Sequence, residues 1–211
     1  MQLVVVRHGE TASNAEQRHT GQMDVPLNAL GERQARALAH ALARERFDLV
    51  VASDLMRARQ TATAIAPVLE APVTYDPDLR EISAGEWEGL TRAEILKRFP
   101  DDLARWDANA TEFPPPGGET VAQLAGRVSR ALARARSAQP DGAVLWVTHG
   151  VVIGVLICHV LGIDLSHRAQ FRRDNAAITE LAVGERGGVL LRLNDTHHLA
   201  GLGSGEREQV M

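Results

Sequence analysis

The sequence is poor in cysteine and has no long uninterrupted apolar run. Its single cysteine, Cys158, cannot form an intramolecular disulfide, so we expect it to fill the core of a protein from a reducing compartment. The apolar run Val151–Cys158 ends at His159 and is far too short to cross a bilayer. No basic segment precedes the first apolar run, as one would in a signal peptide. These absences predict a cytoplasmic protein that does not act on membranes.

Neither sign of charge predominates. Lys and Arg number 23 and Asp and Glu 27, which gives a formal net charge of −4 and an isoelectric point near 6.1. This balance provides no general attraction to nucleic acid, so positive charges that serve a function must act locally. The 211 residues are 45% hydrophobic and 24% charged, a composition ordinary for a globular protein with a sizeable core.

Segments typical of strands and helices alternate along the chain. Buried strands are predicted at 3–6, 47–52, 72–75 and 143–147, helices at 31–46, 55–69, 91–99, 119–138 and 151–161, and a hairpin at 178–193. Ser53 and Asp54 are expected to cap the helix that follows them, and Pro100 is expected to stop the helix before it. The alternation predicts an α/β fold, a three-layer sandwich with a central, mostly parallel sheet flanked by helices.

The chain is expected to form one domain over residues 1–200, followed by a flexible tail at 201–211. Residues 76–118 are less regular and include the triple proline Pro114–Pro116, so we expect them to form a small cap over the carboxyl edge of the sheet. The polar loop at 10–28 is unusually long for a connection, and long loops are often functional.

Two of the predicted strands end in the same way. The first runs into Arg7-His8-Gly9, and a later one runs into Thr148-His149-Gly150. Ligands of open α/β sheets bind beyond the carboxyl ends of the strands, so both histidines would meet at one edge if these strands are neighbours. Taken alone, His8 could equally follow a core strand and bond only a backbone carbonyl. The repetition favours a site built on paired histidines.

Paired histidines suit three kinds of chemistry. Metal binding requires further ligands at close spacing, and neither His8 nor His149 has them. A serine hydrolase would carry a G-x-S-x-G turn, which this sequence lacks. The third chemistry is attack by histidine on phosphorus, which needs arginines to hold the phosphoryl oxygens and an acid to protonate the leaving group.

The sequence offers a residue for each of these roles. Arg7 adjoins His8, and Arg57 falls one turn into the helix after the second strand. Asn14 could donate to a phosphate oxygen from the long loop, and Glu81 could be the acid. Each also has a plainer interpretation, as a solvated surface charge for Arg57 and Glu81 and as an ordinary turn residue for Asn14. The residues alone leave these alternatives open.

Five sequence blocks together resemble the histidine phosphatase superfamily, also called the phosphoglycerate-mutase-like family, over most of the chain. The blocks are R-H-G-E-T-x-x-N at Arg7–Asn14, S-D-L-x-R-A-x-Q-T-A at Ser53–Ala62, L-R-E…G-x-W-E-G at Leu79–Gly89, P-G-G-E at Pro116–Glu119 and V-T-H-G at Val147–Gly150. Five blocks in this order are far more specific than any one of them. Ser13 is a departure, because many members carry tryptophan there; it affects the shape of the pocket rather than its chemistry.

The resemblance implies a phosphoglycerate-mutase-like fold and a role for each site residue. His8 would be the nucleophile, and Glu81 would protonate the leaving oxygen and then activate water. Arg7, Arg57 and a protonated His149 would hold the phosphoryl group and supply the positive field, so that no metal and no cofactor is implied. The residues expected to bind substrate are Asn14, Thr20, Gly21, Gln22, Gly150 and Arg92. Further candidates for specificity are Arg18, His19 and residues 106–113.

The resemblance also bears on the choice between phosphatase and mutase. Mutases of the family carry a tyrosine-glycine pair after the acid and a longer basic insertion. Here Glu81 is followed by Ile-Ser-Ala-Gly, which favours the phosphatase branch with α-ribazole phosphatase and the broad-specificity phosphatases. The sequence thus predicts a metal-independent hydrolase of a small phosphorylated metabolite, with no nucleic-acid partner and with a homodimer compatible with the pattern. A cofactor-dependent phosphoglycerate mutase and a non-catalytic phosphoester-binding module are the alternatives.

Overall fold

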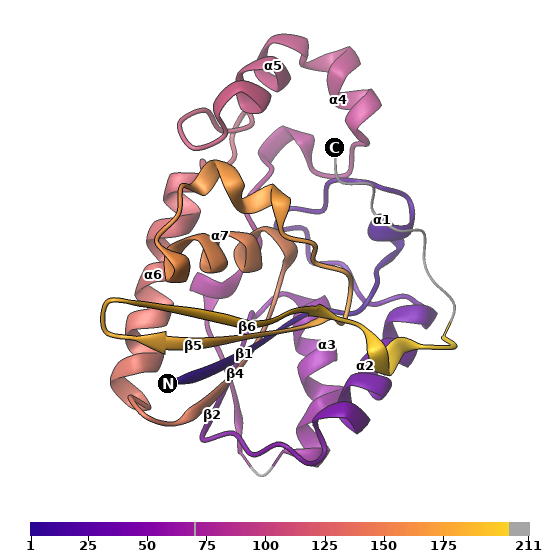
Figure 1. Ribbon diagram of the computed structural model, residues 1–211. Coiled ribbons are helices and arrows are strands. Elements are labelled where there is room, and N and C mark those ends of the chain that lie inside the picture. The colour runs from indigo at the N-terminus through magenta and orange to yellow at the C-terminus, as the bar shows by residue number, and fades with distance from the viewer. Residues whose placement is uncertain (70, 203–211) are drawn as a thin grey trace.

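A six-stranded sheet lies at the centre of the computed structural model, which describes residues 1–69 and 71–202 (Figure 1). The strands are β1 (Gln2–Arg7), β2 (Leu49–Ala52), β3 (Val73–Tyr75), β4 (Ala143–Thr148), β5 (Ile178–Gly184) and β6 (Gly187–Asp195). They lie in the order β3-β2-β4-β1-β5-β6. The first four pair in parallel, whereas β5 and β6 are antiparallel. The predicted mostly parallel sheet is confirmed.

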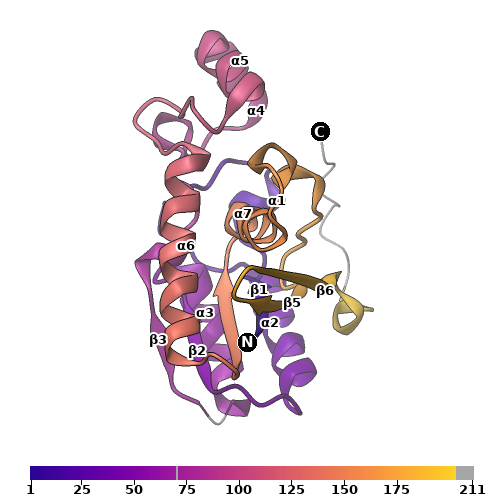
Figure 2. The same ribbon diagram turned by 60° about the vertical axis from the view of Figure 1, so that its left-hand side comes forward.

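Helices cover both faces of this sheet (Figure 1, Figure 2). The α-helices of the described residues are α1 (Ala12–Ala15), α2 (Ala29–Leu42), α3 (Met56–Ile65), α4 (Arg92–Arg98), α5 (Pro100–Asn109), α6 (Val121–Ala138) and α7 (Gly150–Leu161), and those that cover the sheet are α2, α3, α6 and α7. One apolar cluster packs α2 and α3 onto one face through side chains such as Val4 and Leu38. A second cluster packs α6 and α7 onto the opposite face through side chains such as Val5 and Leu124. The three-layer sandwich is therefore confirmed.

The two central strands are buried on both faces. In β1 and β4 every residue after the first is fully or almost fully buried, as expected of continuous β-branched and apolar runs in a parallel sheet. Helix α6, which packs on the face of the sheet covered by the second apolar cluster, begins at a capping box. Thr120 Oγ1 accepts from the Gln123 backbone N–H at 3.1 Å, and Gln123 Oε1 accepts from the Thr120 N–H at 2.8 Å.

The segment between β3 and α6 stands beyond the helix layers at one end of the molecule, where Figure 1 shows α4 and α5. It has its own small apolar cluster, centred on Trp87, Ile95 and Leu103. Two main-chain hydrogen bonds join this segment to His19. The His19 N–H donates to the Leu90 carbonyl oxygen at 2.9 Å, and the Gly89 N–H donates to the His19 carbonyl oxygen at 2.7 Å. This segment therefore lies against the loop that follows β1. The tail expected at 201–211 falls almost wholly outside the described residues.

Two expectations about helix ends need correction. Pro100 ends α4 as expected, but it also begins α5, which the sequence did not predict; proline is well suited to a first helical position because its missing N–H has no partner there anyway. Helix α3 is preceded by Leu55, without a side-chain cap. Ser53 and Asp54 are engaged elsewhere, Ser53 with His149 and Asp54 in an ion pair with an arginine.

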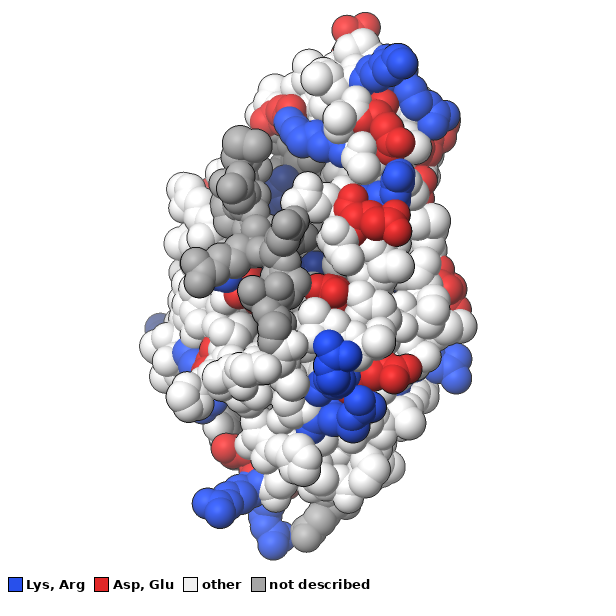
Figure 3. Space-filling model, turned by 90° about the vertical axis from the view of Figure 1, so that its right-hand side faces the viewer, with Lys and Arg blue, Asp and Glu red and all other residues white. Residues whose placement is uncertain are grey.

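Acidic and basic side chains lie interspersed on the face shown in Figure 3. In the segment that carries α4 and α5, Arg92 pairs with Asp107, and Glu94 pairs with Arg18 of the loop after β1. Within the described part of the chain, no helix is both long enough and apolar enough to cross a membrane.

Candidate active site

The sheet brings the two predicted histidines together. Strands β1 and β4 pair in parallel with Arg7 opposite Thr148, so His8 and His149 leave neighbouring strands at the same level. Their ring centroids are 5.1 Å apart, and the planes are tilted by 58°. Only 3% of His8 and none of His149 is exposed. The expectation that these strands are neighbours is confirmed, and the pair lies at the carboxyl edge of the sheet.

His8 is held in one orientation and one tautomer. Its Nδ1 lies 2.7 Å from the carbonyl oxygen of Gly9, which can only accept, so Nδ1 carries the proton. Nε2 therefore keeps its lone pair, 3.2 Å from the Nε–H donor of Arg57. Burial, and then the positive charges of Arg57 and Arg7, hold the pKa of His8 well below its usual range. The ring is thus a neutral imidazole whose unprotonated Nε2 accepts a hydrogen bond from Arg57.

Arg57 is a buried residue, not a solvated surface arginine. It is 1% exposed, and its Nη1 and Nη2 donate to the carbonyl oxygens of Met23 and Gly21, both at 2.8 Å. Burial lowers the pKa of Arg57 to about 10, which still leaves it charged near neutral pH. The long loop after β1 therefore fixes a guanidinium beside the Nε2 atom of His8.

His149 is bonded through one ring nitrogen only. Its Nε2 lies 2.8 Å from the hydroxyl oxygen of Ser53, which directly follows β2, and its buried Nδ1 has no hydrogen-bond partner among the described residues. Burial, followed by the charge of Arg57, lowers the pKa of His149 well below its usual range. The sequence predicts a protonated His149 that holds a phosphoryl group, and the charge of a phosphoryl anion would raise this pKa, so the protonated state stays a prediction. With the Ser53 hydroxyl donating to Nε2, the neutral ring presents Nδ1–H as a donor suited to an anionic oxygen.

Arg7 and Glu81 meet at the first turn of α7. A methyl group added at Gly150 would lie 3.5 Å from Arg7 Cζ and 3.8 Å from Glu81 Oε2, so the three residues are neighbours. Glu81 Oε1 accepts from its neighbouring Ile82 N–H at 2.9 Å, and Oε2 accepts from the Val151 N–H of α7 at 3.1 Å. A carboxylate thus lies at the positive end of helix α7, beside the guanidinium of Arg7, the last residue of β1.

The other residues predicted to bind substrate fall into two groups. Gln22 donates through Nε2 to the backbone oxygen of Glu81 at 3.1 Å, and Gly21 supplies the carbonyl that holds Arg57. Asn14 Oδ1 accepts from Asn175, whose Nδ2 also donates to the backbone oxygen of His8. These three residues therefore contact Glu81, Arg57 and Asn175, which line the site.

The remaining ones lie further out. The Thr20 hydroxyl is 3.5 Å from the backbone oxygen of Arg18. Arg92 is not brought to the histidines: its side chain is 59% exposed and pairs with Asp107 at 2.6 Å within the α4–α5 segment. Arg18 is likewise engaged, with Glu94 at 2.9 Å.

Sequence reasoning missed two residues that contact the core of the site. Ser53 was interpreted as a helix cap, although its place at the carboxyl end of β2, on the same sheet edge as both histidines, could have indicated its contact with His149. Asn175 lies in an irregular stretch before β5, and no spacing in the sequence points to it. Within residues 1–69 and 71–202, no group of three or more His, Cys, Asp and Glu side chains could hold a metal ion.

Residues 3–196 match the histidine phosphatase superfamily (branch 1), and the chain belongs to this family. It is 34% identical over 199 residues to phosphoserine phosphatase 1 of Hydrogenobacter thermophilus, with 94% of each chain covered. It is 35% identical to a protein of Enterobacter sp. named "Probable phosphoglycerate mutase GpmB", covering 94% of this chain and 95% of that one. The structure of α-ribazole phosphatase from Shigella flexneri superimposes with a TM-score of 0.85 at 30% identity, covering 92% of this chain and 96% of that one. The predicted phosphoglycerate-mutase-like fold and the assignment as a phosphatase enzyme are confirmed.

Proposed function

We propose that this protein hydrolyses a phosphomonoester of a small metabolite through a phosphohistidine formed on His8. The observation that carries the proposal is the state of His8. Its Nδ1 proton is fixed by Gly9, and its unprotonated Nε2 faces Arg57 inside a buried site. A histidine in this state can attack phosphorus without first losing a proton.

The neighbouring side chains suit the charge of a phosphoryl group. Arg7, Arg57 and the Nδ1–H of His149 lie around His8, and each can donate to a non-bridging oxygen. These donors are buried and held by the protein, so they need little reorganisation when charge develops on the phosphoryl oxygens. Asn14 adjoins this group through Asn175.

The reaction would proceed in two displacements. In the first, His8 Nε2 bonds to phosphorus while the P–O bond to the leaving group breaks, and protonated Glu81 gives its proton to the departing oxygen. In the second, Glu81 takes a proton from water as the water oxygen bonds to phosphorus and the N–P bond breaks. Inorganic phosphate leaves, and Glu81 is protonated again.

Mutase activity is the second candidate, because several relatives at 33–35% identity carry the name "Probable phosphoglycerate mutase GpmB". The only tyrosine in the sequence, Tyr75, lies 47% exposed on the outer strand β3 and not beside Glu81. The tyrosine that the family resemblance associates with mutases is therefore not next to the acid, which favours hydrolysis.

Steady-state turnover in the presence of EDTA tests the proposal. The panel holds p-nitrophenyl phosphate, O-phosphoserine, α-ribazole phosphate, sugar phosphates, and 3-phosphoglycerate with 2,3-bisphosphoglycerate. We expect phosphate release from at least one ester and its loss in His8→Ala. Isomerisation without phosphate release would make the protein a mutase. Binding of phosphoesters without either reaction would make it a binding module.

A further inference from the structure

The segment that carries Glu81 lies against helix α6 and is hydrogen-bonded to it. Three arginines of this helix, Arg127, Arg130 and Arg134, are spaced so that they share one face, and all three contact residues 76–81. The segment has no regular structure of its own between the short 3₁₀ helix Pro77–Leu79 and the next one at Gly85–Trp87. Its conformation therefore depends on contacts with its surroundings.

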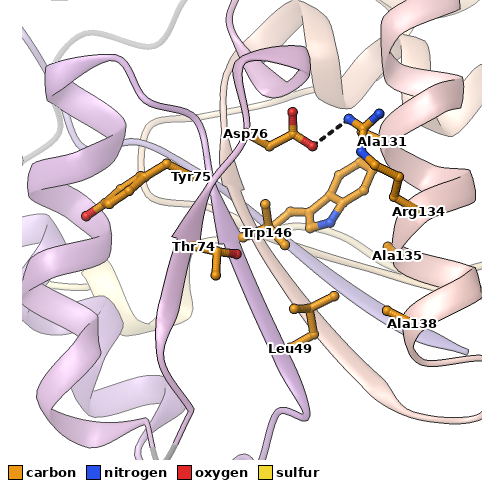
Figure 4. Close-up of a pocket in the computed structure, with 10 residues that line it drawn as sticks. Leu49, Thr74, Tyr75, Asp76, Ala131, Arg134, Ala135, Ala138 and Trp146 are labelled. Atoms are coloured by element: carbon orange, nitrogen blue, oxygen red, sulfur yellow. Dashed lines mark hydrogen bonds and ion pairs between the residues drawn. The ribbon is translucent and has the colours of Figure 1, made fainter.

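Two of the three arginines form ordinary surface ion pairs. Arg134 reaches Asp76 at 2.6 Å, as Figure 4 shows, and Arg130 reaches Asp78 at 2.8 Å. Their side chains are 51% and 62% exposed. Exposed pairs of this kind contribute little, because water screens them and both side chains lose freedom.

Arg127 is different in burial and in partners. Its side chain is 8% exposed. Nη1 donates to the backbone oxygens of Asp78, at 2.9 Å, and Arg80, and Nη2 donates to the backbone oxygen of Glu81 at 2.8 Å. One guanidinium thus binds three backbone carbonyls, two that precede the proposed acid and the carbonyl of Glu81 itself.

Glu119 completes this contact and comes from the P-G-G-E block. Its Oε1 accepts from Arg127 Nε at 2.9 Å, and its Oε2 accepts from Arg127 Nη2 at 3.0 Å and from the Ser83 N–H at 2.9 Å. The backbone of this block lies directly against the backbone of the segment that carries Glu81, because a Cβ atom added at Gly118 would lie only 2.6 Å from Ser83 O. The P-G-G-E turn therefore brings a carboxylate to the arginine and to the acid-bearing segment at once.

We infer that Arg127, oriented by Glu119, is a positioning residue that fixes the backbone of Glu81 so that its carboxyl group can reach the leaving oxygen. This inference rests on the proposed function, in which Glu81 is the general acid. Arg127 acts through the Glu81 carbonyl, which also accepts from Gln22. Displacing a catalytic group by about 1 Å can lower a rate by about 100-fold.

The test compares two esters of similar size. Phenyl phosphate has a basic leaving group that needs a proton, whereas the leaving group of 2,4-dinitrophenyl phosphate departs without one. The value of kcat/KM for each is measured in wild type, Arg127→Met, Arg127→Lys and Glu81→Gln. Arg127→Lys guards against a folding failure of the methionine variant, because it keeps the charge, but a single ammonium cannot span three carbonyls and a carboxylate. The matched control is Arg130→Met, on the same helix and the same segment.

We expect both Arg127 variants to lose about 10-fold or more in kcat/KM for phenyl phosphate relative to 2,4-dinitrophenyl phosphate, as Glu81→Gln does. Arg130→Met should keep the wild-type ratio. In the double variant Glu81→Gln with Arg127→Lys, the ratio should fall no further, because the acid is already absent. Equal losses on both esters in the two Arg127 variants would overturn the inference and indicate a structural role. If Glu81→Gln itself keeps the wild-type ratio, the acid assignment in the proposed function fails instead.

Discussion

Acidification is expected to destabilise this fold through its two buried histidines. In the unfolded chain His8 and His149 titrate near pH 6.5. In the folded chain burial, together with the charge of Arg57, holds the pKa of each well below that value. Between the two values the unfolded chain binds protons that the folded chain does not. Stability from this source is therefore complete above about pH 6.5 and is lost as the pH falls from there towards the folded pKa.

The magnitude follows from proton linkage. While a histidine stays unprotonated in the folded state, lowering the pH from 7.5 to 5.5 costs about 1.4 kcal/mol of unfolding free energy, or about 2.7 kcal/mol for both. Carboxylates with lowered pKa values, such as Asp54 and Asp78, contribute only at more acidic pH. His8→Asn removes one of the two titrating rings, so its loss over the same interval should be smaller by about 1.4 kcal/mol.

Urea denaturation at the two pH values measures this loss. The fluorescence of Trp87 and Trp146, each 1% exposed, reports unfolding. Other titrating groups, including the half-buried His198, are common to wild type and variant and cancel in the comparison. An equal loss of stability in wild type and His8→Asn would refute the claim that His8 is held neutral by burial and its arginine neighbours.

Three further changes test individual contacts. Ser53→Ala leaves His149 Nε2 buried without a partner, so it should lower stability by about 1–3 kcal/mol and also lower kcat; unchanged urea midpoint and kcat would contradict the contact. Gly31→Ala places a Cβ atom 2.1 Å from Glu10 O and should cost about 1–3 kcal/mol in urea unfolding. The control Gly126→Ala in α6, whose Cβ would meet only the flexible Arg130 side chain at 4.0 Å, should be neutral or stabilising. Arg57→Lys cannot hold two loop carbonyls and a phosphoryl oxygen together, so kcat/KM should fall by about 100-fold or more; a fall below about 3-fold would show that charge alone suffices.

The sequence was sufficient to predict the sheet and the histidine pair, because both depend on local patterns. Buried apolar runs that end at His8 and His149 specify parallel strands, and neighbouring parallel strands present their ends at one edge. The role of Pro100 was harder to predict, since a proline that stops one helix can also begin the next. Whether α5 forms depends on packing of Leu103 against Trp87, which no short stretch encodes.

The parts of the site that sequence reasoning missed depend on contacts between distant segments. Ser53 was expected to cap α3, because serine before a helix does so in most settings, but the neighbouring strand places His149 within 2.8 Å of it. Arg127 donates to the backbone carbonyls of residues 46 or more positions away. Because every residue has a backbone carbonyl, no residue type in the sequence marks these acceptors. Arg92 was expected near substrate on its charge, but Asp107 pairs with it on the outer segment.

Trapping the phosphoenzyme tests the central claim most directly. Glu81→Gln is mixed with 2,4-dinitrophenyl phosphate, whose leaving group needs no acid, so that the second displacement is slowed and the intermediate accumulates. After an alkaline quench and proteolysis, the phosphorylated peptide is located by mass spectrometry. The account predicts an acid-labile, alkali-stable phosphoryl group on His8 and none in the variant that also carries His8→Ala. A phosphoryl group on another residue, or hydrolysis that survives His8→Ala, would contradict it.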